Sequence, residues 1–196
     1  MSDTFKTITA PAEGIYKEKM CKILAFAIPV TSAEEAKSHI AAYQKEYYDA
    51  RHVCWAYMLG AARTNFQSND NGEPSGTAGK PILGQINSFG LTNVLIIVVR
   101  YFGGIKLGTS GLIVAYREAA REAISAAEII ECHETDDISF TFPYLAMNDV
   151  MRLCKSSDIQ IISQTFDNSC CMTVRIRRDL ADTLRLRLAD IDGVTL

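Results

Sequence analysis

The chain has 196 residues, of which 48% are hydrophobic and 22% are charged. These values are typical of a globular protein, and a chain of this length can form one large domain or two small ones. The 20 Lys and Arg residues against 23 Asp and Glu residues give a formal net charge of −3. This balance excludes a basic protein that coats nucleic acid, although it permits a local basic patch.

The sequence also lacks membrane and secretion signals. Apolar runs such as Val94–Val99 are far shorter than the roughly 20 residues that a membrane-spanning helix needs. Met1–Ala10 has no apolar segment of the kind found in secretion signals. The six cysteines show no CxxC spacing. We therefore expect reduced thiols in a cytoplasmic protein that does not bind membranes.

The first predicted elements are a strand and a helix. Lys22–Val30 is an apolar run rich in strand formers. Thr31 and Ser32 follow as a helix start, with Glu34 and Glu35 placed to complete a capping box. Five residues then recur at the spacing of one buried helical face: Ala33, Ala36, Ile40, Tyr43 and Tyr47.

The next segments contain two predicted strands and most of the glycines. His52–Leu59 is predicted as a strand, followed by a long polar loop at Arg63–Gly76 and a short helix with Pro81 in its first turn. Val94–Tyr101 is apolar on both faces and predicts a central strand. A glycine turn at residues 102–108 then leads into a helix at residues 109–128.

A polar stretch, Glu131–Asp137, predicts a boundary between a domain at residues 1–133 and a second domain at residues 134–196. The second part is predicted as strand, helix, strand, strand, helix. Leu184–Leu188 alternates like a strand, but Leu180, Leu184 and Leu188 recur at helical spacing, which favours a helix. This order in a short segment predicts an α+β, ferredoxin-like βαββα domain.

Several familiar motifs fail on inspection. Gly103–Gly108 has the spacing of a phosphate-binding loop, but Thr109 and Ser110 follow where that loop needs a lysine. Ser68–Glu73 resembles a calcium loop without its ligand set. His52 and Cys54 could form a nucleophilic pair, although a buried cysteine beside a hydrogen-bonded histidine is the favoured interpretation. We predict no metal site and no cofactor.

Two long segments carry a family resemblance. Asn69–Leu83 resembles the GEPSGTAGxPIL signature of the IMPACT/YigZ family, and Val98–Thr109 is similar to its VVRYFGGxKLGTGGL signature. Asp49–Tyr57 resembles a third family segment, A-x-H-x-C-x-A-Y. The chain departs from the pattern at Met20-Cys21-Lys22-Ile23, where the family usually has Gly-Ser-Lys/Arg-Phe.

The resemblance implies an α+β protein whose N-terminal domain is like domain 2 of ribosomal protein S5, followed by a small ferredoxin-like domain. It also implies binding rather than catalysis, since eukaryotic relatives act by protein binding and modulate a translation-linked stress kinase. The expected partners are RNA, the ribosome or a translation-associated protein, with no role in DNA binding.

Two hypotheses place function on the glycine-rich segments. In the first, a partner or anion is held by a set of residues that offer charge, hydroxyls or backbone amides: Asp70, Glu73, Ser75, Gly76, Thr77, Lys80, Arg100, Tyr101, Gly103, Gly104, Lys106 and Thr109. The alternative is an enzyme acting on a phosphorylated small molecule or nucleotide, with His52, Asp70 and Glu73 as acid–base candidates. The first hypothesis is favoured.

Overall fold

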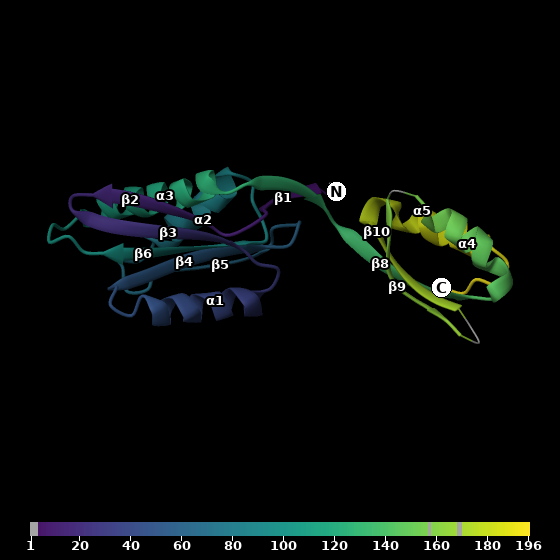
Figure 1. Cartoon of the computed structure of the whole chain (residues 1–196). Coiled ribbons are helices and arrows are strands. Elements are labelled where there is room, and N and C mark those ends of the chain that lie inside the picture. Colours follow the sequence, from purple (N-terminus) through teal and green to yellow (C-terminus); the bar gives the residue numbers. More distant parts are fainter. Residues whose placement is uncertain (1–3, 157, 168–169) are drawn as a thin grey trace. The chain divides into compact units, whose positions relative to one another are not determined.

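The computed structural model describes residues 4–156, 158–167 and 170–196. The chain is a mixed α/β protein with antiparallel sheets, and it divides into two compact units (Figure 1). The larger unit is Phe5–Cys132, and the smaller unit contains His133–Leu196 together with Thr4. Within the described residues, no helix is long and apolar enough to cross a membrane.

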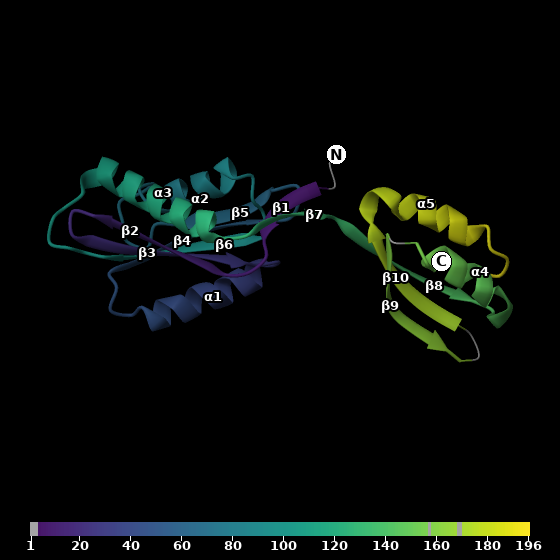
Figure 2. The same ribbon diagram turned by 45° about the horizontal axis from the view of Figure 1, so that its top comes forward.

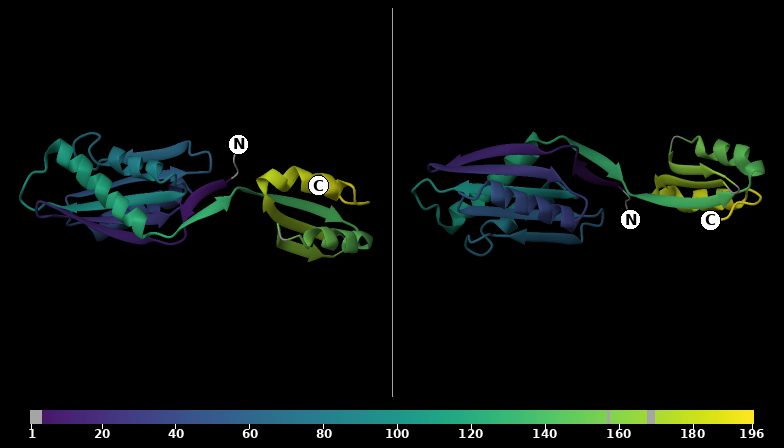
Figure 3. Two further views of the ribbon diagram at one scale, coloured as in Figure 1. Left: turned by 90° about the horizontal axis from the view of Figure 1, so that it is seen from above. Right: turned by 60° about the horizontal axis from the view of Figure 1, so that its bottom comes forward.

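The larger unit is built on a five-stranded antiparallel sheet in the order β2-β3-β6-β4-β5. Its strands in that order are β2 (Ala12–Glu18), β3 (Cys21–Pro29), β6 (Val94–Tyr101), β4 (His52–Leu59) and β5 (Asn65–Asn69). Helix α1 (Ala33–Glu46) covers one face, whereas α2 (Gly79–Ser88) and α3 (Gly108–Ala126) cover the other (Figure 3).

The middle strand β6 is buried on both faces, as predicted. Val94, Ile96 and Val98 pack in the cluster under α2 and α3. The alternate residues, Leu95, Ile97 and Val99, pack in the cluster under α1. Because helices cover both faces, every position from Val94 to Val99 must be apolar.

The predicted start of α1 is confirmed. The Ser32 hydroxyl accepts a hydrogen bond from the backbone N–H of Glu35 at 3.1 Å. The Glu35 carboxylate in turn accepts one from the backbone N–H of Thr31 at 2.7 Å. These reciprocal bonds satisfy donors that a helix N-terminus leaves free. The expected position of Pro81 in the first turn of α2 is also confirmed.

Four strands were not expected. The loop predicted at Arg63–Gly76 contains β5, and β7 (Ile129–His133) runs into the predicted boundary segment. Strand β7 pairs with β1 (Thr4–Ile8), and β2 forms an edge of the large sheet. Strands β2 and β5 lie at sheet edges, and β1 and β7 form a two-stranded ribbon, so none needs the continuous apolar pattern that marks a buried strand.

The smaller unit has the predicted order of strands and helices (Figure 2). Its elements are β8 (Thr135–Phe142), a 3₁₀ turn (Tyr144–Ala146), α4 (Met147–Cys154), β9 (Ile159–Phe166), β10 (Cys170–Arg177) and α5 (Arg178–Ala189). Strand β10 lies between β8 and β9 and is antiparallel to both. Both helices contribute to one core, with Val150 from α4 and Leu184 from α5, which confirms the helix at Leu184–Leu188.

Candidate functional site

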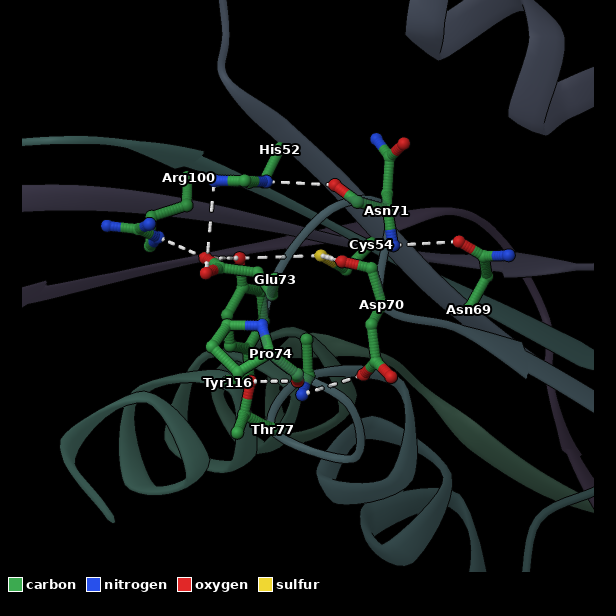
Figure 4. A network of polar contacts seen from close by, with 11 residues as sticks. His52, Cys54, Asn69, Asp70, Asn71, Glu73, Pro74, Thr77, Arg100 and Tyr116 are labelled. Atoms are coloured by element: carbon green, nitrogen blue, oxygen red, sulfur yellow. Dashed lines mark hydrogen bonds and ion pairs between the residues drawn. The ribbon is translucent and has the colours of Figure 1, made fainter. Parts of the chain in front are cut away.

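The two signature segments meet at one end of the large sheet. Strand β4 begins there at His52, which lies beside Arg100 near the end of β6. The loop between β5 and α2, residues 70–78, lies over this end of the sheet (Figure 4). We call the polar side chains that hold the loop in place the loop network: His52, Cys54, Asp70, Glu73, Arg100 and Tyr116.

Glu73 lies at the centre of the loop network and is buried. Its Oε1 accepts hydrogen bonds from Arg100 Nε at 2.5 Å and from the Tyr116 hydroxyl at 2.8 Å. Burial alone would lower the pKa of Arg100, but the contact with Glu73 raises it, so the guanidinium stays charged. Glu73 is therefore the counter-ion of a buried cation and is not free to act as an acid or base.

His52 joins the loop to β4. Its Nδ1 donates to the backbone carbonyl of Asn71 at 2.8 Å, and its Nε2 lies 3.8 Å from Glu73 Oε2. The imidazole is buried, with 8% of the residue exposed. Both ring nitrogens thus face the loop, so the histidine has little surface left for a substrate.

Cys54 is a buried thiol that is hydrogen-bonded to the loop. It is fully buried, and its Sγ donates to the backbone carbonyl of Asp70 at 2.9 Å. Burial raises the pKa of Cys54 to about 12 and also raises the pKa of Tyr116, whose hydroxyl lies 3.4 Å from the sulfur. Since the thiolate is the nucleophile, this environment argues against the Cys–His pair.

Asp70 closes the loop onto the start of α2. Its Oδ1 accepts from the backbone N–H groups of Ala78 and Gly79, at 3.0 and 2.8 Å, and its Oδ2 accepts from Gly76 at 2.8 Å. Partial burial acts to raise the pKa of Asp70, but these three backbone donors and nearby Lys80 lower it below the ordinary value. Asp70 thus caps α2 from outside the helix.

Glycines allow the close backbone contacts around the site. A Cβ at Gly79 would lie 2.8 Å from the backbone nitrogen of Asn69, and one at Gly103 would lie 2.2 Å from the carbonyl oxygen of Met20. Gly104 has a φ of +91°, which confirms the expectation of a positive φ in this turn. Met20 itself has a φ of 66°, in the region that favours glycine.

A shallow cavity of about 250 Å³ opens beside the loop network. It is lined by the Glu73 carboxylate, by apolar residues and by groups that can bind an anion: Glu73, Pro74, Arg100, Phe102, Lys106, Leu107, Gly108, Thr109 and Leu112. Lys106 and Thr109 are exposed, whereas Arg100 is 7% exposed and paired with Glu73. The free cation of this cavity's lining is therefore Lys106.

The remaining predicted residues lie around this centre. Lys80 is exposed, and its side chain would lie 3.5 Å from a Cβ placed on Gly76, near Asp70 rather than in the cavity lining. Ser75 is exposed, and the buried Thr77 donates to the Pro74 carbonyl at 2.7 Å. The Tyr101 hydroxyl donates to Asp49 at 3.0 Å.

Sequence reasoning missed one member of the loop network. Tyr116 is not a candidate from the sequence, because its spacing in the predicted helix is that of an inward-facing core position. A hydroxyl on a helix face otherwise formed by alanine and leucine was the available signal, since a buried tyrosine usually finds a hydrogen-bond partner. Within the described residues, no cluster of three or more His, Cys, Asp or Glu side chains is placed to hold a metal ion.

Comparison with known proteins agrees with this architecture. The Impact N-terminal domain family matches residues 19–124. An IMPACT family member from Haemophilus influenzae is 36% identical over 135 residues, which are 68% of this chain and 66% of that protein. IMPACT family member YigZ from Escherichia coli is 29% identical over 189 residues, which are 95% and 93% of the two chains.

Solved structures extend the comparison. A crystal structure described as that of a hypothetical protein has a TM-score of 0.75 and 27% identity, covering 97% of this chain and 93% of the other. The two-domain translational regulator Yih1 aligns with a TM-score of 0.38 and 22% identity, over 62% and 47% of the chains. The fold and the loop site define a two-unit mixed α/β protein with a glycine-rich loop locked over a sheet end. The chain belongs to the IMPACT family.

Proposed function

We propose that this chain is a non-enzymatic binding protein that regulates a process linked to translation. The proposal depends on one observation: the polar residues of the signature segments that could act as acid or base hold the loop, whereas other residues of these segments are exposed. The acid–base candidates His52, Asp70 and Glu73 are all engaged in holding the loop. The exposed residues of the same segments form what we call the motif surface: Ser75, Lys80, Phe102, Ile105, Lys106 and Thr109.

The motif surface suits recognition of a partner more than turnover of a substrate. Lys80 and Lys106 are exposed cations, and Phe102 and Ile105 are exposed apolar side chains, 47% and 49% exposed. Cations that contact phosphates, with an aromatic side chain that can stack on a base, are features of single-strand RNA binding. RNA, the ribosome or a translation-associated protein is thus the proposed partner.

The folds that we propose for the two units support a link to translation. We propose that Phe5–Cys132 shares the fold of domain 2 of ribosomal protein S5 and that the smaller unit is ferredoxin-like. The order β8-β10-β9 is that of three ferredoxin-like strands, and Thr195 bridges to Thr141 where a fourth strand would add to β8. Fold analogy is an indirect argument for function. Yih1, for its part, is described as a translational regulator.

The test is a titration of the full chain with total RNA at several salt concentrations. Changing Lys80→Ala together with Lys106→Ala should weaken binding at least tenfold. Each phosphate contact contributes about 0.7 to the salt slope for single strands, so the slope should fall by about 1.4. Thermal stability should change little, because exposed charges contribute little to folding.

The matched control is Lys37→Ala together with Lys45→Ala, which removes two exposed lysines from α1 on the opposite face of the sheet. This control should bind RNA like the parent. Equal binding by the Lys80 and Lys106 double variant would refute the motif surface. Turnover of a panel of phosphorylated metabolites would favour the enzymatic alternative. If the parent chain binds no RNA but captures a translation-associated protein, the double variant should fail to capture it. That result would support the motif surface, with a protein as its partner.

A further inference from the structure

Strand β9 of the smaller unit is an edge strand of its sheet. It lies at the end of the order β8-β10-β9 and so pairs on one side with β10 (Figure 2). Its eight residues, IQIISQTF, include no charged residue and no proline. Ile161, Ile162 and Phe166 are 37%, 42% and 48% exposed. Long, uncharged and apolar edges are templates for pairing with another strand, and proteins usually protect them with charges or prolines.

The opposite edge of the same sheet is partly covered. Thr195, near the end of the described chain, forms two backbone hydrogen bonds with Thr141 of β8, at 2.8 and 2.9 Å. Strand β8 also carries Asp136 and Asp137, which pair with Arg178 and Arg175. Charges and a bridging segment thus protect β8, whereas β9 has neither of these within the described residues, and its one irregularity is the register shift against β10.

We propose that β9 pairs in antiparallel fashion with β9 of a second copy of this chain, joining two three-stranded sheets. In the register that uses all eight residues, Ile159 lies opposite Phe166 of the second copy, and the two-fold axis passes between Ile162 and Ser163. An antiparallel strand pair of identical sequence has the closed symmetry of an isologous dimer.

The register follows from the faces of the strand. Ile159, Ile161 and Phe166 lie opposite the buried residues of β10 and so face the helix-covered side, as does Gln164. Gln160, Ser163 and Thr165 lie opposite Arg175, Thr173 and Cys171 and so face the open side, and the register shift falls at Ile162. In this register, Ile159 and Phe166 of the second copy face the same side of the joined sheet. The other pairs match in the same way, because the register shift lies at the two-fold axis. A slip by one residue would join opposite faces.

A second copy fits this edge because the strand is complementary to itself. Its apolar residues Ile159 and Phe166 stand at opposite ends, so each copy offers an apolar partner to the other. The eight residues of β9 carry no charge, so like-charge repulsion in this register is confined to the exposed Asp158 and Asp167 that flank the strand. An interface of two strands is small, so the dimer should be weak and depend on protein concentration.

Sedimentation equilibrium of the full chain, from low micromolar to near-millimolar concentration, tests the proposal. The parent should shift from monomer to dimer. Ile162→Lys places like charges beside the axis and should weaken association at least tenfold. Adding Ser163→Glu to Ile162→Lys should restore the dimer, because each lysine then lies opposite a glutamate of the second copy. Circular dichroism checks that each variant is folded.

The matched control is Leu186→Lys, which replaces a 70% exposed leucine of α5 away from the edge. It should associate like the parent. A parent that stays monomeric throughout, or an Ile162→Lys variant that dimerises as well as the parent, would overturn the proposal. Failure of the Ser163→Glu rescue would overturn the register. Growth of the parent into larger assemblies would contradict a closed dimer.

Discussion

Two carboxylates of one motif hold the same loop by different means. Asp70 accepts three backbone N–H groups and ties the loop to the start of α2. Glu73 is buried against Arg100 and Tyr116 and ties the loop to β6 and α3. A carboxylate with backbone donors and a carboxylate with a buried cation are both costly to remove, since their partners would lose their hydrogen bonds without access to water.

Asp70→Asn should reduce the free energy of unfolding by about 2 kcal/mol at neutral pH, because it weakens hydrogen bonds to a charged group. The folded-state pKa of Asp70 lies below its ordinary value. Its contribution is therefore present above the unfolded pKa and is lost as the pH falls through the folded pKa. The difference between parent and variant should shrink at acid pH.

Urea unfolding at neutral and at acid pH measures this difference. Glu46→Gln, a change at an exposed position of α1, is the control and should leave the unfolding free energy nearly unchanged at both values. A difference between parent and Asp70→Asn that stays constant with pH would show that the lost contact is not electrostatic.

At the scale of elements, the turn after β6 rests directly on the β2–β3 hairpin. Lys19 and Met20 form a two-residue connection, since Glu18 pairs with Cys21, and both have positive φ values of 44° and 66°. This geometry is that of a type I′ hairpin turn. Gly103 packs against the backbone of Met20 in this hairpin turn, and the Gly103 N–H donates to Cys21 Sγ at 3.4 Å. Met20 and Cys21 thus lie against the second signature segment.

Gly103→Ala should destabilise the larger unit by about 1–3 kcal/mol, because the added Cβ would overlap the Met20 carbonyl. Gly84→Ala is the matched control. Gly84 is exposed within α2 and has open space around it, so its replacement should stabilise the helix by roughly 0.5–1 kcal/mol. Chemical unfolding followed by tryptophan fluorescence compares the two. Equal effects would show that the turn does not rest on the hairpin.

At the scale of the whole molecule, each unit has a core of its own. The larger unit contains two hydrophobic clusters, one on each face of its sheet, and the smaller unit contains a third. The one tryptophan of the chain, Trp55, lies in β4 of the larger unit. Its fluorescence therefore reports on the environment of that unit alone. We propose that the two units unfold separately.

Leu188→Ala, at a fully buried position of the smaller unit, should cost about 2–5 kcal/mol there. The midpoint of unfolding followed by Trp55 fluorescence should stay at its parent value, while amide exchange in β8 and β10 becomes faster. The matched variant Ile96→Ala should move the Trp55 midpoint, because Ile96 lies in the core of the larger unit. A shift of the Trp55 midpoint by Leu188→Ala would contradict separate unfolding.

Features with a local physical cause were predictable from the sequence. The capping bonds of Glu35 with Ser32 and Thr31 join residues three and four apart, and the apolar pattern of β6 reflects helices on both of its faces. The positive φ in the Gly103–Gly104 turn was likewise predictable, because glycine adopts it at little cost. The family signatures lie in continuous segments and needed no structure.

Only the tertiary structure decided which polar residues meet. Glu73 contacts Arg100 and Tyr116, which lie 27 and 43 residues further along the chain, so spacing in the sequence cannot reveal the pairing. For the same reason, the contacts by which Asp70 and Glu73 hold the loop could not be predicted from the sequence. Strands β1, β2, β5 and β7 also depended on tertiary structure, because edge and two-stranded pairings are set by the neighbouring strand more than by an apolar pattern of their own.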